Sequence, residues 1–405
     1  MTNPSKILAV ELLVKLYGAL ALCGDSAALP IISMKVIQMS LVYGMSPRSP
    51  AAIAKYGSWL ATSQNEYEEG YRYAKLSLSL MRQIPSRAHD GSTMFWSSLT
   101  RLYVEPIQSS IVGYHDAYKA HMKSGNPYAV ASAYTFNDLC LWSGKELNAV
   151  VIAMKDTMKE SKYIKNVVVP KLTLPMLQVA LRLIGHSDVP VPQQDSVTND
   201  LGKSLKEDDI TVSYAIHSLT TIFAKLFEFL IFRELNEARD ATEKYFFLRR
   251  FESSSSTPSL FFRRFYSGLV SFWVAREMGD NKNKSWKWLG RGVECKDELV
   301  KLSVSASTWN FQNKAYLLQA EEQFCSRNFE MAETLYDAAI SSSKIHKFVN
   351  EEALANELAG YFYLETGRRN RSLHYFSQAF EKYNEWGAVA KANTLTEYLS
   401  DENER

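Results

Sequence analysis

Two Gly-Lys pairs are the first candidates for chemistry in this sequence, because a nucleotide-binding phosphate loop has the form G-x-x-x-x-G-K-[ST]. The pair Gly144-Lys145 is followed by Glu146, which cannot bind the metal as a Ser or Thr would. The run Gly202–Ser204 ends correctly, but position 197, where the earlier glycine should stand, holds valine. We therefore predict no nucleotide site at either pair.

The histidines and carboxylates of this sequence do not have the spacing of a phosphorelay site, a catalytic site or a metal site. His115 and His121 are six residues apart, which places them on different faces of a helix. His346 and His374 lack a pattern of acidic neighbours, and the sequence has no H-E-x-x-H, H-R-D, D-F-G or G-x-S-x-G motif. The acidic run Glu207–Asp209 is interpreted as the start of a helix, where carboxylates favour the positive end of the dipole. We expect no catalytic residue, no cofactor and no metal, and the chain is predicted not to be an enzyme.

Two arginine pairs, Arg249-Arg250 and Arg263-Arg264, flank a serine-rich segment and alternate with phenylalanines. One interpretation is an anion or nucleic-acid patch with stacking aromatics. The favoured interpretation is two helix ends whose phenylalanines point inward and whose arginines are solvated. Phosphorylation near Thr257-Pro258, paired with these arginines, is a further hypothesis.

The bulk composition gives no support to a nucleic-acid-binding or membrane role. The net charge is +2 and the sequence pI about 8.1, whereas a nucleic-acid-binding domain usually has a pI above about 9. The most apolar stretch, residues 216–232, contains His217, Lys225 and Glu228, so we predict no membrane span. The four cysteines have no metal-ligand or C-x-x-C spacing, which indicates reduced thiols in a cytoplasmic protein.

Helical periodicity dominates the elements that would carry any site. We predict helices over 7–17, 29–43, 50–63 and 66–84, and further hairpins over 95–124 and 127–160. Residues 85–91 and 252–259 are predicted loops, and the valine run at 166–174 is interpreted as a connection between helices. The predicted organisation is N-terminal repeats over 1–185, a long loop or linker over 186–209, and C-terminal repeats over 210–400.

The last hundred residues contain an internal repeat. Small, small, aromatic and small residues recur at offsets 0, 12, 16 and 19, and the two sets, 40 residues apart, are Ala320, Ala332, Tyr336 and Ala339, then Gly360, Ser372, Phe376 and Ala379. This pattern is typical of tetratricopeptide-type hairpins, in which small residues let two helices approach closely. Ser58, Gly70 and Ser77 hold the small offsets near the N-terminus. We predict an all-α fold, a right-handed α-solenoid of such hairpins, with Trp386 packed under the last one.

A partner groove follows from the repeat pattern. In such hairpins the ligand-facing positions lie six and three residues before, and one and four after, the first small residue of the first helix. The polar and aromatic residues at these positions form the predicted partner groove: Lys314, Glu321, Phe324, Glu357 and Tyr361. They could hold a peptide or a partner helix, or pack on a neighbouring domain.

Several segments also resemble the tetratricopeptide-like region of large hybrid sensor kinases. The phrase Asn350–Leu364 and the W-G-A-x-A-K-x-x-x-L string over 386–395 look like the end of that array, and Tyr43–Pro50 and Tyr118–Lys145 are similar to its earlier segments. Proteins of this kind combine a Ser/Thr-kinase-like domain, an AAA-type ATPase, the repeat array, a GAF domain and a histidine kinase. The other domains are not in this sequence, so a fragment, a truncated gene and a free-standing relative are all left open.

The resemblance implies a regulatory module in signal transduction that binds proteins or neighbouring domains. A stand-alone helical-repeat adaptor and a helical-repeat RNA binder remain alternatives, as does an enzyme whose site is assembled from scattered residues. The expected partners are proteins, with no nucleic acid, membrane or metal.

Overall fold

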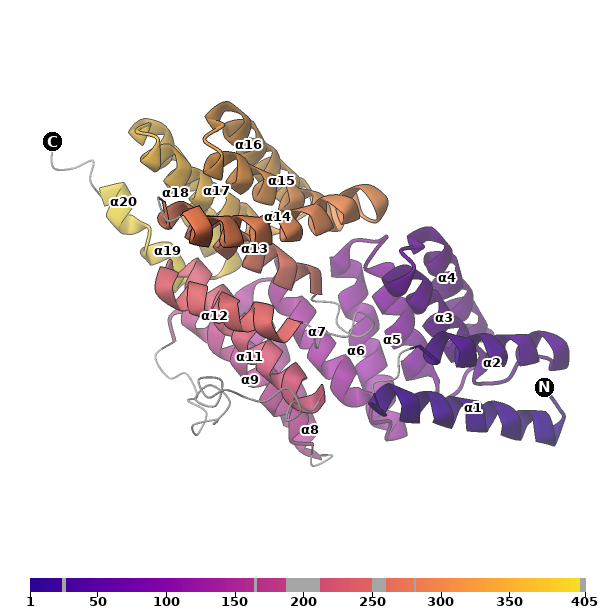
Figure 1. The fold of residues 1–405 in the computed structure, drawn as a ribbon. Coiled ribbons are helices and arrows are strands. Elements are labelled where there is room, and N and C mark those ends of the chain that lie inside the picture. The colour runs from indigo at the N-terminus through magenta and orange to yellow at the C-terminus, as the bar shows by residue number, and fades with distance from the viewer. Residues whose placement is uncertain (24–26, 164–165, 187–211, 250–259, 280–281, 401–405) are drawn as a thin grey trace. The chain divides into compact units, whose positions relative to one another are not determined.

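The computed structural model of the chain describes residues 1–405 apart from 24–26, 164–165, 187–211, 250–259, 280–281 and 401–405. Every regular element in the described part is an α-helix, and successive helices pack on one another, which confirms the predicted all-α class (Figure 1). The predicted linker 186–209, the run Gly202–Ser204, the acidic run Glu207–Asp209 and the serine-rich segment lie almost wholly in the parts left undescribed. These interpretations stay predictions.

The described residues form two compact units that divide within one helix, between Phe136 and Asn137. Unit 1 holds Met1–Phe136 and Ser305–Ser307, and unit 2 holds the other described residues. The helices of unit 1 are α1 (Pro4–Cys23), α2 (Leu29–Tyr43), α3 (Ser49–Ser63), α4 (Tyr67–Gln83), α5 (Asp90–Arg101), α6 (Ile107–Ser124) and the first part of α7 (Ala129–Trp142).

Small residues set the crossing of α3 and α4 in unit 1. A Cβ placed on Gly57 would lie 2.8 Å from the carbonyl oxygen of Gly70, and one placed on Gly70 would lie 2.6 Å from that of Gly57. Both distances are shorter than any real contact, so the two backbones can approach this closely only through glycines. A proline lies in the first turn of α2 and of α3, where its fixed φ suits the start of a helix.

Unit 2 is built from the rest of α7 and the helices that follow. These are α8 (Leu147–Tyr163), α9 (Val168–Ile184), α11 (Val212–Ile231), α12 (Leu235–Leu248), α13 (Leu260–Glu277), α14 (Lys282–Ser305), α15 (Thr308–Cys325), α16 (Phe329–Ile345), α17 (Val349–Glu365), α18 (Arg369–Trp386), α19 (Val389–Asn393) and α20 (Thr396–Ser400). The fully buried Trp142 ring lies 4.7 Å from Phe227 and 5.6 Å from Tyr266, centroid to centroid. These aromatic rings form one core from α7, α11 and α13.

Residues 166–174 are not the connection that the valine run indicated, because α9 begins within them. Asn166 Oδ1 accepts hydrogen bonds from the amides of Val168 (2.9 Å) and Val169 (3.0 Å), which caps the first turn. Pro170 lies in that turn, where its missing N–H costs nothing. Pro175 lies inside α9, a helix with many buried apolar residues, and we attribute the tolerance of this proline to that burial.

The turns of the C-terminal hairpins recur at the sequence period. Arg327 and Gly367 both have positive φ, at 59° and 75°, and so do Lys347 and Gly387, at 62° and 89°. Each pair is 40 residues apart. The residue after each of them donates its amide to a carbonyl five residues earlier, which closes the helix end in the same way. The backbone of α15–α16 and of α17–α18 therefore repeats with the period of the small residues.

Candidate functional site

The predicted repeat-packing residues lie where the helices of each hairpin meet. Ala320, Ala332 and Ala339 are buried between α15 and α16, and a Cβ on Gly360 would lie 2.7 Å from the ring of Phe376. The Ser372 hydroxyl donates to the carbonyl of Gly360 at 2.9 Å. The remaining four of these positions are also buried: Tyr336, Phe376, Ala379 and Trp386.

Lys314, the first predicted groove residue, is fully buried. Its ammonium forms an ion pair with Glu351 at 2.8 Å and donates to the carbonyl of Asn310 at 2.9 Å. Burial lowers the pKa of Lys314 and raises that of Glu351, since each charge has lost its hydration. A partner could reach Lys314 only by displacing Glu351.

Glu357 holds a second buried ion pair. One carboxylate oxygen is 2.7 Å from Lys391 Nζ, and the other accepts the Tyr383 hydroxyl at 2.7 Å. Glu357 and Lys391 are each 1% exposed at the side chain. The pair links α17, α18 and α19, and burial lowers the pKa of Lys391 although Glu357 opposes this.

Glu321 and Phe324 both contact the guanidinium group of Arg276. Arg276 of α13 pairs with Glu321 at 2.5 Å, and its guanidinium carbon lies 4.4 Å from the Phe324 ring centroid. Glu321 also accepts the Tyr336 hydroxyl at 2.6 Å. The fifth predicted groove residue, Tyr361, is half-buried beneath Arg233, whose guanidinium carbon lies 4.3 Å from its ring.

The end of α7 and the residues after it contact the turn before α17 and the end of α18. Asn350 Nδ2 donates to the carbonyl of Trp142 (3.4 Å), and Trp386 Nε1 donates to that of Lys145 (3.0 Å). Gly144 has φ 82°, and a Cβ there would lie 2.8 Å from the carbonyl oxygen of Lys347. Four of the five residues predicted to line a partner groove are buried in unit 2 and pair with or pack on its own helices, and Tyr361 is half-buried. The repeat pattern alone could not show that residues 142–147 pack against residues 347–350 and 386.

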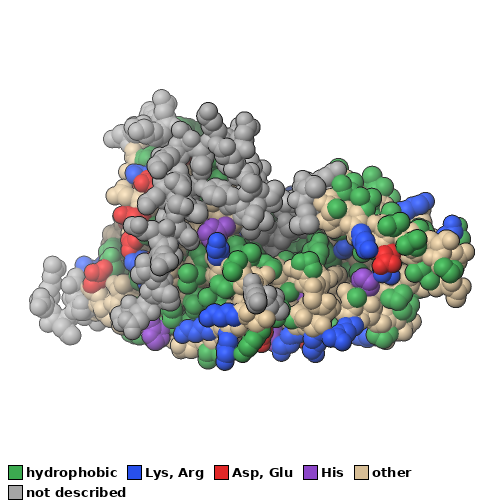
Figure 2. All heavy atoms as spheres, turned by 90° about the horizontal axis from the view of Figure 1, so that it is seen from below, with side chains coloured by type: hydrophobic (Ala, Val, Ile, Leu, Met, Phe, Trp, Pro, Cys, Tyr) green, Lys and Arg blue, Asp and Glu red, His purple; other side chains and the backbone are tan. Residues whose placement is uncertain are grey.

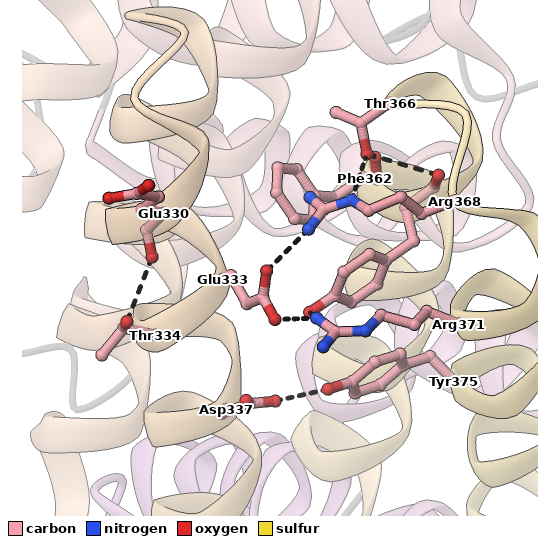
Figure 3. Close-up of polar contacts among 10 residues, drawn as sticks. Glu330, Glu333, Thr334, Asp337, Phe362, Thr366, Arg368, Arg371 and Tyr375 are labelled. Carbon is pink, nitrogen blue, oxygen red and sulfur yellow. Dashed lines mark hydrogen bonds and ion pairs between the residues drawn. The ribbon is translucent and has the colours of Figure 1, made fainter.

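The outer side of the same hairpins carries a second set of contacts. Figure 3 shows Glu333 of α16 between Arg368 and Arg371, which are both paired with it, and Asp337 accepting the Tyr375 hydroxyl at 2.6 Å. The Arg371 side chain is 55% exposed. Exposed ion pairs contribute little stability, so we expect these contacts to add little to the packing of α16 against α18.

Apolar side chains form a surface on α1 and α2 of unit 1. Their exposed fractions range from 44% to 72%, and they are Leu8, Leu12 and Leu16 on α1 and Ile31, Met34, Leu41 and Val42 on α2. We call this set the apolar surface. The spacing of four residues on α1 places its leucines on one helix face. Figure 2, which views the side on which α1 lies in Figure 1, shows hydrophobic side chains exposed among Lys and Arg.

Two minor predictions have different outcomes. Phe261, Phe262 and Phe265 point into the core as expected, whereas Arg263 is 2% exposed, so the prediction of solvated arginines is wrong there. Most of the first turn of α13 is buried with its phenylalanines, and Arg263 is buried along with them. His121 is buried between Ser132 Oγ (3.0 Å) and Ser92 Oγ (3.3 Å), as a packing histidine would be.

Among the described residues, no three His, Cys, Asp or Glu side chains are grouped closely enough to ligate a metal. No described helix has both the length and the apolar character needed to cross a bilayer. No protein-family model matches the chain, and no curated protein matches it significantly.

Proposed function

We propose that this protein is a non-catalytic helical-repeat module that binds another protein through the apolar surface of α1 and α2. The exposure of that surface carries the proposal. Leu12 of α1 is 57% exposed and Leu41 of α2 is 72% exposed, in helices whose other faces are packed in unit 1. Contiguous exposed apolar side chains on a folded unit mark interaction sites.

The charges beside the apolar surface define the partner. Lys15 and Lys35 are exposed, and neither has an acidic partner among the described residues; Lys6 lies 4.7 Å over the Tyr43 ring. A complementary partner presents apolar residues in the middle and carboxylates at the rim. We propose that it is an amphipathic helix with acidic flanks, which fits beside a helix pair by the usual packing of ridges into grooves.

The architecture we propose is a right-handed solenoid of tetratricopeptide-like hairpins. The 40-residue recurrence of small residues and of turn conformations supports it. Resemblance to hybrid sensor kinases supports a place in cytoplasmic signal transduction, as the regulatory repeat region of an ATPase-containing kinase or a truncated relative. A stand-alone adaptor would use the same surface.

Site-specific photo-crosslinking in cells tests the proposed function. A photoreactive residue at position 12 or 41 should capture one and the same protein, joined through an acidic amphipathic helix. Position 112 is the control, because Val112 is 63% exposed on α6, outside the apolar surface. The substitutions Leu12→Asp and Leu41→Asp should weaken binding of the purified partner at least about tenfold. Capture of a second copy of this chain, or equal capture at position 112, would contradict the proposal.

A further inference from the structure

Unit 1 contains a cavity of about 180 Å³ on the inward sides of its first helices. Val14 and Tyr17 of α1, Ile32 and Val36 of α2 and Tyr128 after α6 give it apolar and aromatic walls. These residues lie on other faces of α1 and α2 than the apolar surface. The inference drawn from the cavity therefore goes beyond the proposed function and does not depend on it.

Basic side chains line the same cavity. Lys55 of α3, Arg48 and His89 contribute to its walls. Arg48 pairs with Glu11 at 3.1 Å, whereas Lys55 has no carboxylate partner among the described residues. Lys55 Nζ lies 3.6 Å from the centroid of the Tyr17 ring, which supplies only a cation–π contact. The described chain therefore supplies no carboxylate to pair with the amine that Lys55 places in the cavity.

We propose that this cavity binds a small organic carboxylate with an apolar body, with the carboxylate on Lys55 and the body against Val14, Ile32 and Val36. A cavity of about 150 Å³ accommodates benzene in another protein, so an arylcarboxylate such as benzoate has a suitable size. Ser33 and Asn126 also line the cavity and supply hydrogen-bonding groups for the second carboxylate oxygen.

The protonation behaviour of the cavity agrees with an anionic ligand. Burial lowers the pKa of Lys55 to about 7, and burial together with Arg48 and Lys55 lowers that of His89 to about 4. A bound carboxylate would restore a counter-charge and raise the pKa of Lys55. The charged or titratable groups around the amine are Arg48, His89, Glu11, His121, Tyr17 and Tyr128.

Isothermal titration of the full chain with three probes tests the ligand class. Benzoate should bind at least about tenfold more tightly than benzyl alcohol, which lacks the charge, and than inorganic phosphate, which lacks the apolar body. Lys55→Met should weaken benzoate binding at least about tenfold. The control Lys75→Met removes a lysine that lies 4.2 Å over the Tyr71 ring on α4, outside the cavity, and should change nothing.

A measurement on the unaltered chain covers the case in which Lys55→Met does not fold. At pH 8 the amine of Lys55 is mostly neutral, so benzoate binding should take up about one proton, seen by titration in two buffers of different ionisation enthalpy. At pH 6 the uptake should be smaller because the amine is already largely charged. Equal affinity for benzyl alcohol, tighter binding of phosphate, or no binding at millimolar benzoate would overturn the proposal.

Discussion

The inner faces of the two units use the same repeat position in opposite ways. Lys55 precedes the small residue Ser58 by three residues, as Glu357 precedes Gly360. In unit 2, Glu357 meets Lys391 and Tyr383, and the interior is closed. In unit 1, Lys55 faces a cavity without a carboxylate partner in the described chain. A groove position thus becomes structural where the chain supplies the opposite charge, and becomes available to a ligand where it does not.

The largest expected effect concerns closure of unit 2. Trp386 is fully buried, and its indole donates to Lys145 O, so Trp386→Ala should lower the free energy of unfolding by about 3–5 kcal/mol in urea. Trp286→Ala is the control, because that ring is 69% exposed, and it should cost less than about 0.5 kcal/mol. Similar losses for both variants would mean that the last hairpin does not close the unit.

Breaking the buried pair of Lys314 and Glu351 should be nearly as costly. Glu351→Leu leaves the ammonium buried without its carboxylate, which we expect to cost about 3–5 kcal/mol. The double variant Lys314→Met, Glu351→Leu should recover most of that loss. If the single variant were as stable as the double variant in urea unfolding, the pair would be solvated instead of buried.

Low pH should reduce the stability of unit 1, because its buried histidines resist protonation. Burial lowers the pKa of His121 to about 4, while an unfolded histidine titrates near about 6.5. Between these values the unfolded chain binds more protons, so stability falls as pH falls, by up to about 1.4 kcal/mol per pH unit for each such histidine. His121→Asn should flatten the change in melting temperature between pH 7 and 5. An unchanged slope would place the acid sensitivity elsewhere.

The smallest effect is expected on the outer side of unit 2. Arg371→Ala removes an exposed partner of Glu333, while Arg368 remains paired with it. The loss in thermal unfolding should correspond to less than about 1 kcal/mol. A loss comparable to that of Glu351→Leu would show that the outer contacts, and not the inner pairs, hold the hairpins together.

The helices and their close crossings were predictable because they depend on local residues. The prediction of residues 29–43 matches α2, and the small residues at 320, 332 and 339 lie between paired helices. The prediction of a connection at residues 166–174 was wrong, because the side chain of Asn166 caps a helix that begins at Val168.

The burial of the predicted groove residues could not be predicted from the repeat pattern. Whether Lys314 and Glu357 face a partner or the interior depends on Glu351 and on Lys391, each of which lies more than 30 residues further along the chain. Two residues that line the cavity of unit 1 could be identified from the sequence, because the same offset rule applied to Ser58 selects Ala52 and Lys55. The rule does not tell whether a residue of opposite charge lies beside the selected position, because that depends on how the helices pack.

Two lysine substitutions with the same replacement test the difference between the inner faces most directly. In urea unfolding at pH 7 without ligand, Lys391→Met should lose about 3–5 kcal/mol because Glu357 is left buried and unpaired. Lys55→Met should keep or raise the free energy of unfolding, because it removes an amine that burial disfavours as a cation. Equal losses for the two variants would contradict the account.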